Sequence, residues 1–157
     1  MTRAALFAGS MLALAGCGSG STDPAALPSP DAVVHLLSLG NAANVAVTSD
    51  SAADLRLRPH VYPQPPVQTA HAVVDAIEHL PRWEVVAGRD GVIWATRRTR
   101  ILGRVDDVYL LLLPAHDSTA VFARSASRAA LVDFGQNRRN LGELWEALDK
   151  KSVKSEK

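Results

Sequence analysis

The sequence has few residues with reactive side chains, and few features that are typical of nucleic-acid-binding proteins or membrane channels. Of its 157 residues only one is a cysteine and 5% are aromatic, and 17 Lys and Arg nearly balance 16 Asp and Glu. A near-neutral charge argues against nucleic acid as a partner. After the N-terminus no run of about 18 or more uncharged apolar residues occurs, which excludes a multi-span membrane protein. There is no Gly-rich phosphate loop and no internal repeat. A hydrophobic content of 47% suits one small domain that needs neither disulfide nor metal to fold.

The single cysteine ends a lipoprotein signal pattern. Arg3 precedes an apolar run over residues 4–14, and the sequence Leu14-Ala15-Gly16-Cys17 follows. In such a pattern the leader is cut before the cysteine, whose thiol carries diacylglycerol. The alternative is an ordinary Ala-Gly cleavage site with an incidental cysteine. We predict a signal peptide over residues 1–16 and lipidation, including palmitate, at Cys17. Several acyl chains would hold the protein at a membrane without a transmembrane helix.

This interpretation has consequences for charge, redox chemistry and location. Removing 16 of the 157 residues leaves 141, with 16 basic and 16 acidic groups, because Arg3 is the only charge lost. Lipidation consumes the only thiol and so excludes a disulfide, a cysteine nucleophile and a thiolate metal site. Residues 17–30, rich in Gly, Ser and Pro, predict a flexible tether. The expected location is a bacterial cell envelope. Gly18, where inner-membrane sorting uses Asp, favours the periplasmic face of the outer membrane if the cell has one.

The remainder predicts a single α+β domain over residues 31–150 and a disordered basic tail over 151–157. Residues 31–39, before Gly40, suit a short helix or an extended chain. A longer helix ending at Pro81 is indicated by apolar residues at three- and four-residue steps. Its apolar face consists of Val67, Ala70, Val73, Val74, Ile77 and Leu80.

An antiparallel sheet of four to five strands is predicted from β-rich runs separated by turn residues. A meander is expected over residues 83–87, 92–99, 105–113 and 119–126, with a short edge strand around residues 60–62. A C-terminal helix should then pack on one face of the sheet. Its start is indicated by Asn140 and Glu143, a capping-box pattern. Its apolar face is Leu141, Leu144, Trp145 and Leu148.

Two adjacent aspartates, Asp106 and Asp107, are the first candidates for chemistry. If loop 114–118 joins its strands symmetrically, Leu113 pairs with Thr119, although a slip of one residue exchanges all cross-strand partners. The neighbours expected in that register are Ala126, Arg124 and Arg128 for Asp106, and Ser125 for Asp107. Successive strand residues point to opposite faces, so the two carboxylates cannot form the close pair needed for glycosidase or aspartic-protease chemistry.

Basic residues are concentrated in the second half of the chain. Residues 89–157 hold 13 basic and 9 acidic groups, whereas residues 17–88 hold 3 and 7. Guanidinium groups there could bind an anion or a phospholipid headgroup. The simpler interpretation, which we prefer, is that the arginines pair with the aspartates and lock a loop to the sheet. The candidate anion-binding or structural network is Asp106, Asp107, Arg124, Ser125, Ser127, Arg128, Asp133, Asn137, Arg138 and Arg139.

Two further arrangements are weak candidates. His71, Asp75 and His79 recur at four-residue steps on a helix, a spacing that can present metal ligands, but a further ligand is not evident. Ser125 and Ser127 lack the Gly-x-Ser-x-Gly context of a hydrolase nucleophile. We therefore assign no catalytic residue, metal or cofactor.

Several motifs resemble the bacterial domain-of-unknown-function family numbered fourteen ninety-nine. They are Val105-Asp106-Asp107-Val108, Arg124-Ser125-Ala126-Ser127-Arg128, Asp133-Phe134-Gly135 and Asn137-Arg138-Arg139. The resemblance covers about residues 44–148. It implies a similar order of helix and strands and, often, a small lipoprotein or envelope protein, but no reaction. Members commonly carry a cysteine-containing segment before the first helix, where this chain has residues 44–49 without cysteine.

Together these features predict a lipid-anchored cell-envelope protein that acts as a non-enzymatic binding or scaffold module. The alternative is an envelope hydrolase that uses Asp106 or Asp107 with the arginines to act on an anionic substrate. The expected partners are the membrane, through the lipid on Cys17, and an anionic headgroup, a glycan or an envelope protein, but not nucleic acid.

Overall fold

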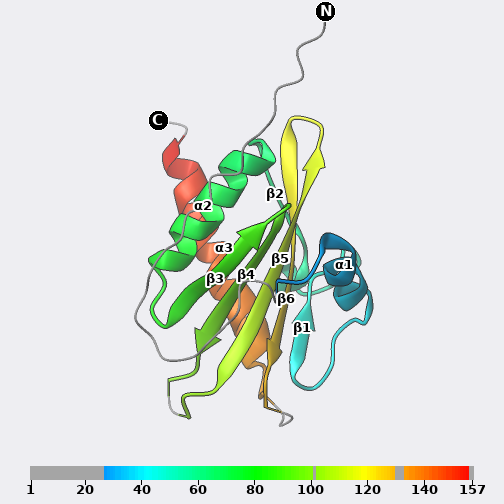
Figure 1. Cartoon of the computed structure of the whole chain (residues 1–157), viewed down its shortest axis with the longest axis vertical. Helices are drawn as coiled ribbons and strands as arrows, with labels where there is room; N and C mark the ends of the chain where they lie inside the picture. The colour runs from blue at the N-terminus through cyan, green and yellow to red at the C-terminus, as the bar shows by residue number, and fades with distance from the viewer. Residues whose placement is uncertain (1–26, 101, 130–132, 156–157) are drawn as a thin grey trace, which may run out of the picture.

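The computed structural model describes residues 27–100, 102–129 and 133–155, so the predicted signal peptide and Cys17 lie outside the described residues. Within the described residues the chain forms an α+β domain with an antiparallel sheet, as predicted (Figure 1). Its elements are α1 Pro30–Ser38, β1 Val45–Val47, the 3-10 turn η2 Leu55–Leu57, β2 His60–Tyr62, α2 Pro66–Glu78, β3 Trp83–Arg89, β4 Val92–Arg98, β5 Val105–Ala115, β6 Ser118–Ser127 and α3 Gln136–Ser155.

The sheet has six strands in the order β1-β6-β5-β4-β3, and β2 also pairs with β6. The predicted meander from β3 to β6 and the predicted edge strand β2 are therefore confirmed. Strand β1 is an addition, because its three residues are too few to produce a recognisable alternation. In β1, Val45 pairs with Ala126 and Val47 with Arg124. Strands β1 and β2 thus share the free edge of β6.

The turn between β3 and β4 explains why this hairpin forms. Asp90 and Gly91 have φ angles of 54° and 78°, and they connect the paired residues Arg89 and Val92. Two successive positive φ angles define the turn type whose twist matches a two-residue hairpin, and Asp-Gly is among its preferred sequences. A Cβ atom at Gly91 would lie 3.0 Å from the Leu112 carbonyl oxygen, so glycine is also required by space.

The predicted register between β5 and β6 is wrong by one residue. Leu113 pairs with Ala120 rather than Thr119, and Pro114 and Ala115 continue the ladder. The reason is the turn, which has two residues rather than five, because His116 adopts a φ of 55° and allows the strands to pair up to Ala115. The slip gives each aspartate a different set of neighbours from those expected.

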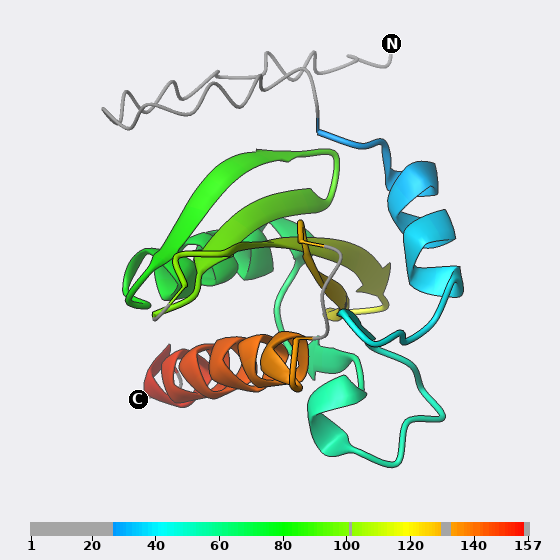
Figure 2. The ribbon, with the colours of Figure 1, turned by 90° about the horizontal axis from the view of Figure 1, so that it is seen from below.

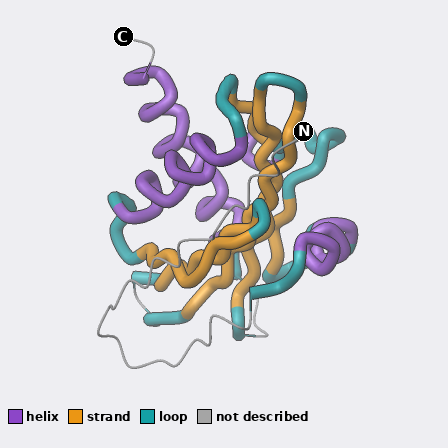
Figure 3. Tube along the Cα trace, turned by 45° about the horizontal axis from the view of Figure 1, so that its top comes forward, coloured by secondary structure: helices purple, strands orange, loops and turns teal. Residues whose placement is uncertain are grey.

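Helices cover both faces of the sheet. Helices α2 and α3 lie on one face, whereas α1 lies across the strands from them (Figures 2 and 3). The larger core is beneath α2 and α3; its largest fully buried side chains include Val73, Ile77, Val108, Leu110, Val121, Leu141 and Leu144. The smaller core, beneath α1, consists of Leu27, Val33, Val92, Trp94 and Leu111.

The N-terminal helix begins before the expected position. Ser29 caps α1, because its side-chain oxygen accepts a hydrogen bond from the Ala32 amide at 3.3 Å. Leu27, which the sequence assigns to the tether, is only 6% exposed because it packs in the core beneath α1. The packed part of the described chain therefore starts before residue 31.

Helix α3 departs from prediction at both ends. It begins at Gln136, so the capping box at Asn140 and Glu143 is wrong. Asp133 supplies the cap instead, since its carboxylate accepts from the amides of Gly135 and Asn137 at 2.9 and 2.7 Å. The helix also continues to Ser155, where a disordered tail was expected from residue 151, because extending an established helix costs little. No helix among the described residues is both long and apolar enough to cross a membrane.

Candidate functional site

The sheet separates the ten candidate residues into groups on opposite faces. In the observed register Asp106 pairs with Ser127, and Asp107 pairs with Ala126. Asp106 faces α3, where it meets neutral polar side chains. Asp107 faces the α1 side together with the arginines. The neighbours expected for the two aspartates are therefore exchanged, as a one-residue slip requires.

On the α3 side Asp106 is fully buried and bound by neutral donors. Ser127 Oγ donates to its Oδ1 at 2.6 Å, and Asn140 Nδ2 donates to its Oδ2 at 2.9 Å. Asn140 Nδ2 also lies 3.0 Å from Ser125 Oγ, which in turn donates to Asn137 Oδ1 at 2.6 Å. Each of these side chains holds α3 against β5 and β6, so this cluster has a structural role.

A charged contact lies beside this cluster. Arg97, paired with Asp106 in the sheet, is 8% exposed. Its Nε lies 3.5 Å from Glu143 Oε2, which also accepts from Trp83 Nε1 at 3.2 Å. Among the described residues Arg97 Nε has no hydrogen-bond partner, so its contact with Glu143 is an ion pair. The contact links β3, β4 and α3.

On the α1 side Asp107 is bound by three donors. Arg128 donates to its two oxygens through Nε and Nη2, each at 2.8 Å, and Trp94 Nε1 donates at 2.9 Å. The hydrogen bond to Asp107 is the main cause that raises the pKa of Arg128. This bidentate pair is the one place where the predicted pairing of an arginine with an aspartate of the network is observed.

Arg124 also lies on the α1 side of the sheet, but its surroundings differ from those of Arg128. It pairs with Tyr109 and Val47 in the sheet and is half-buried. Its Nε is buried and has no hydrogen-bond partner among the described residues. Burial lowers the pKa of Arg124, opposed by attraction to Tyr109 and Asp107, and burial likewise raises the pKa of Tyr109. Arg124 is therefore a half-buried guanidinium whose Nε has no hydrogen-bond partner among the described residues, and a guanidinium is a group that suits an anion.

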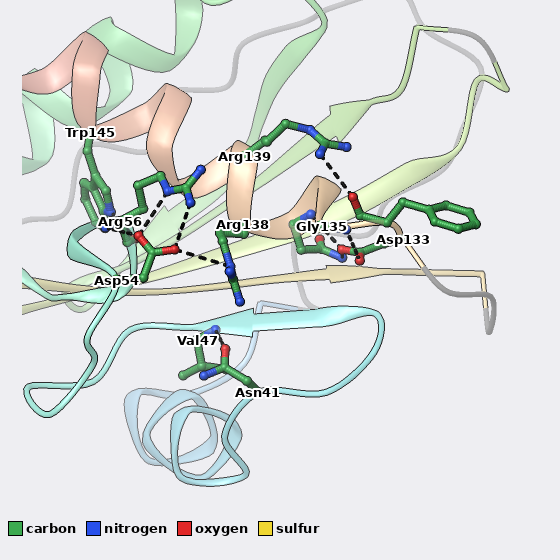
Figure 4. Close-up of polar contacts among 11 residues, drawn as sticks. Asn41, Val47, Asp54, Arg56, Asp133, Gly135, Arg138, Arg139 and Trp145 are labelled. Atoms are coloured by element: carbon green, nitrogen blue, oxygen red, sulfur yellow. Dashed lines mark hydrogen bonds and ion pairs between the residues drawn. The ribbon is translucent and has the colours of Figure 1, made fainter.

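The two arginines of α3 do not join either cluster. Arg138 Nε lies 3.4 Å from Asp54, which also binds Arg56, and the hydrogen bond from Arg56 is the main cause that lowers the pKa of Asp54 (Figure 4). Arg139 donates to the Phe134 carbonyl oxygen and to a neighbouring glutamine. The predicted pairing of these two arginines with Asp106, Asp107 or Asp133 is wrong, because Arg138 contacts Asp54 and Arg139 binds the residues at the start of α3.

Asp133 and Asn137 connect the preceding loop to α3. Asn137 is fully buried, and its Nδ2 lies 2.6 Å from Asp133 Oδ2 and 2.8 Å from the Asn44 carbonyl oxygen. It also donates to Ser127 Oγ at 3.2 Å. These contacts join α3, β6 and the segment before β1, and they satisfy donors that the fold itself buries.

An open groove of about 430 Å³ separates α1 from the sheet. We call it the α1 groove. Its floor is Leu111 and Leu113 of β5 and Phe122 of β6. Its walls are Val34, Leu37, Ser38, Gly40 and Asn41 on one side, and Val47, Thr48, Ser49 and Asp50 on the other. The two walls are tied together where Asn41 Oδ1 accepts from the Val47 amide at 2.8 Å (Figure 4).

These positions limit what the site can do chemically. Asp106 has no contact with solvent, and Asp107 is held by three donors, so neither offers an accessible, unpaired carboxylate for acid or base chemistry. For the metal hypothesis, the structure gives a contact between His79 and Asp75. No group of three or more His, Cys, Asp or Glu suited to a metal occurs within the part of the chain that the structure describes.

Sequence reasoning missed several members of the site. Arg97 and Glu143 were not chosen because a single charged residue in a strand or helix is ordinarily a surface residue. Trp94 and Tyr109 were interpretable only as packing residues. The sequence does not indicate the α1 groove, because the residues of its floor alternate in the same way as those of any buried strand face.

The comparisons with known proteins agree with the motifs noted in the sequence. A family model described as "Protein of unknown function (DUF1499)" matches residues 27–148. No curated protein matches the chain significantly. One similar solved structure is the crystal structure of TTHA0849 from Thermus thermophilus, with a TM-score of 0.35 and 13% identity, covering 63% of this chain and 97% of that chain. With the family match spanning most of its length, the chain belongs to the DUF1499 family.

Proposed function

We propose that this protein is a lipid-anchored, non-enzymatic binding module of the bacterial cell envelope, with its ligand site on the α1 side of the sheet. The proposal is carried by a contrast between charged groups. Asp106 and Asp107 accept hydrogen bonds from neighbouring side chains. Arg124, in contrast, has a buried Nε without a hydrogen-bond partner among the described residues. Because both carboxylates bind groups within the protein and the Arg124 guanidinium does not use its Nε donor, this face of the sheet is suited to binding an anion.

The membrane anchor is proposed from the signal pattern that ends at Cys17. Mass spectrometry of the protein from the membrane fraction should find an N-terminal Cys17 carrying acyl chains, preferably on the outer membrane. A Cys17→Ser chain is the control and should leave that fraction. A chain that keeps residues 1–16, or an unmodified Cys17 on a membrane-bound protein, would contradict the anchor.

Binding and catalysis can be separated by substitutions on the same face. In cells that lack the gene, a copy with Asp107→Asn should restore the phenotype caused by the deletion, because the asparagine Oδ1 can still accept from Trp94 Nε1 and Arg128 Nη2. A copy with Arg124→Gln should not restore it. The opposite pattern would favour a hydrolase that uses Asp107.

A further inference from the structure

We infer that one end of the sheet binds the surface of an anionic lipid bilayer, with arginines on the lipid phosphates and two exposed apolar side chains between the headgroups. We call this surface the basic end, and it consists of Arg82, Arg98, Arg100, Leu102, Arg104 and Phe134. The inference goes beyond the proposed function and does not rest on it, because the basic end belongs to the folded domain and can be tested on a chain without lipid.

Pairing within the sheet brings the segments of the basic end together. A row of paired residues crosses β3, β4, β5 and β6 just inside this end: Trp83, Arg97, Asp106 and Ser127. Beyond the row, the Arg98 amide donates to the Arg82 carbonyl oxygen at 2.9 Å. Helix α3 starts at the same end, since Asn137 Nδ2 donates to Ser127 Oγ at 3.2 Å. Figure 1 shows the end of β4, the start of β5 and the start of α3 together at the lower end of the sheet.

The four arginines of the basic end are available to a ligand. Arg82, Arg98 and Arg100 are exposed, and Arg104 is partly exposed. Within residues 27–100, 102–129 and 133–155, none of the four side chains makes a hydrogen bond or an ion pair. Their guanidinium groups can therefore bind phosphate oxygens without breaking a contact that the fold uses.

Acidic residues do not cancel this charge. Those near the basic end are Glu78, Glu84, Asp107 and Asp133. Asp107 binds Arg128 through two hydrogen bonds, and Asp133 accepts from the first amides of α3. Six arginines, those of the basic end with Arg128 and Arg139, thus lie near four carboxylates. Close to an anionic bilayer, each arginine that reaches the surface strengthens binding about fivefold.

The apolar side chains of the basic end are strongly exposed. Phe134 is 84% exposed, more than any other large hydrophobic residue that the structure describes, and Leu102 is 65% exposed. Phe134 has a φ of 51°, which is uncommon for a bulky residue. Its carbonyl oxygen accepts from Arg139 Nη1 at 3.1 Å, and this contact stabilises the conformation that leaves the ring in solvent. Both apolar side chains would lose contact with water by entering the headgroup region.

The arrangement suits a bilayer better than a protein partner. A stable protein interface buries about 800 Å² on each partner around an apolar centre. In the basic end Leu102 and Phe134 belong to separate loops, and arginines rather than further apolar residues accompany them. A bilayer accepts single apolar side chains between its lipids, while guanidinium groups bind the phosphates with paired hydrogen bonds.

The test uses residues 17–157 with Cys17→Ser, which lacks both the predicted signal peptide and the lipid. This chain should sediment with vesicles of equal parts phosphatidylglycerol and phosphatidylcholine in about 0.01 M salt, but not with phosphatidylcholine alone. Binding should be lost in about 1 M salt, because the Debye length falls from about 30 to about 3 Å. No binding to the anionic vesicles, equal binding to both kinds, or binding that salt does not change would overturn the inference.

Matched variants then locate the contact. Arg100→Gln should weaken vesicle binding about fivefold, whereas Arg89→Gln, in the hairpin turn at the opposite end, should have little effect. Phe134→Asn should weaken binding about tenfold, and asparagine tolerates the positive φ. Val61→Asn removes a side chain that is 62% exposed on β2 and should change little. Circular dichroism confirms that each variant folds. Equal effects within either pair, or loss of binding in a chain that ends at Lys150, would place the contact elsewhere.

A spin label measures the depth of the contact directly. Because Cys17 is the only cysteine of the chain, Phe134→Cys and Asp117→Cys each add a single labelling site to the Cys17→Ser chain. On anionic vesicles the label at residue 134 should be accessible to oxygen and shielded from a water-soluble nickel complex, whereas the label at 117 should remain in water. Two labels in water would overturn the inference, and so would self-association through Phe134 without vesicle binding. Acylation of Cys17 in cells, combined with either result, leaves the anchor intact and overturns only the inference.

Discussion

Asp106 is the most deeply buried of the charged residues that the structure describes. Its carboxylate is shielded from water, and its hydrogen bonds come from a hydroxyl and an amide rather than from an arginine. Burying a charge is costly unless hydrogen bonds compensate for lost hydration. The hydrogen bonds from Ser127 and Asn140 therefore stabilise the buried carboxylate, and the carboxylate in turn satisfies these two donors.

Removing this acceptor should destabilise the protein strongly. We expect Asp106→Ala to lower the free energy of unfolding by about 3 kcal/mol, because the buried Asn140 Nδ2 and the partly buried Ser127 Oγ would each lose an acceptor. Urea denaturation measures the change. Asp117→Ala, at an exposed turn, is the control and should change stability by less than about 0.5 kcal/mol. Similar values for the two variants would show that the buried cluster does not stabilise α3.

Tyr62 links the stability of the fold to alkaline pH. Its hydroxyl donates to Asp149 Oδ1 at 3.1 Å, and burial is the main cause that raises the pKa of Tyr62, followed by the charge of Asp149. The folded pKa thus lies above the unfolded value of 10.0. The contribution of the phenol is complete below about pH 10 and is lost as the pH rises from there toward the folded pKa.

We therefore expect Tyr62→Phe to cost about 1 kcal/mol near neutral pH, through the lost hydrogen bond, and to lose less stability than the wild type above about pH 10. Urea midpoints measured across this pH range test the prediction. Tyr109, whose pKa is also raised, remains in both proteins and provides the residual slope. An identical alkaline slope in the two proteins would contradict the assignment to Tyr62.

At the scale of elements, α1 is shorter than α2 and α3 and is held by fewer buried residues than α2. It contributes one buried residue, Val33, whereas α2 contributes four. Hydrogen exchange measured by mass spectrometry should therefore show faster exchange for the amides of α1 than for those of α2, because local opening of α1 exposes little apolar surface. Equal protection of α1 and α2 would contradict the weaker attachment of α1.

Elements with strong periodicity were predictable, whereas their ends and register were not. The apolar steps of α2 and the β-rich runs of β3 to β6 carry their own signal. The β5–β6 register depends on the positive φ angle of His116, and histidine adopts such an angle too rarely for the sequence alone to predict it. Asn140 resembled a cap because polar residues before an apolar run usually are caps. Its amide instead binds Asp106, a contact between residues 34 positions apart.

At the scale of the molecule, the sheet decides which candidate residues meet. The sequence grouped ten residues because they are polar and close in order, but β5 and β6 send alternate side chains to opposite faces. Asp106, Ser125 and Ser127 consequently support α3, whereas Asp107, Arg124 and Arg128 face the α1 side. The register decides which aspartate joins which group, so a one-residue error exchanged the neighbours of Asp106 and Asp107. Predicting the groove would have required the position of α1 relative to the sheet, and no local sequence pattern gives that position.

The domain also depends on its last helix as a whole. Leu141, Leu144, Trp145 and Leu148 are at most 3% exposed, and burying each contributes about 1.5–3 kcal/mol, a total comparable with the whole stability of a domain, about 5–15 kcal/mol. A chain ending at Arg139 should therefore fail to fold. A chain ending at Lys150 keeps these four residues and Asp149 and should unfold cooperatively with nearly the full-length midpoint. Circular dichroism during heating measures both. If the shorter chain melted like the full-length protein, α3 would be an appendage, and the buried contacts of Asp106 with it would carry no stability.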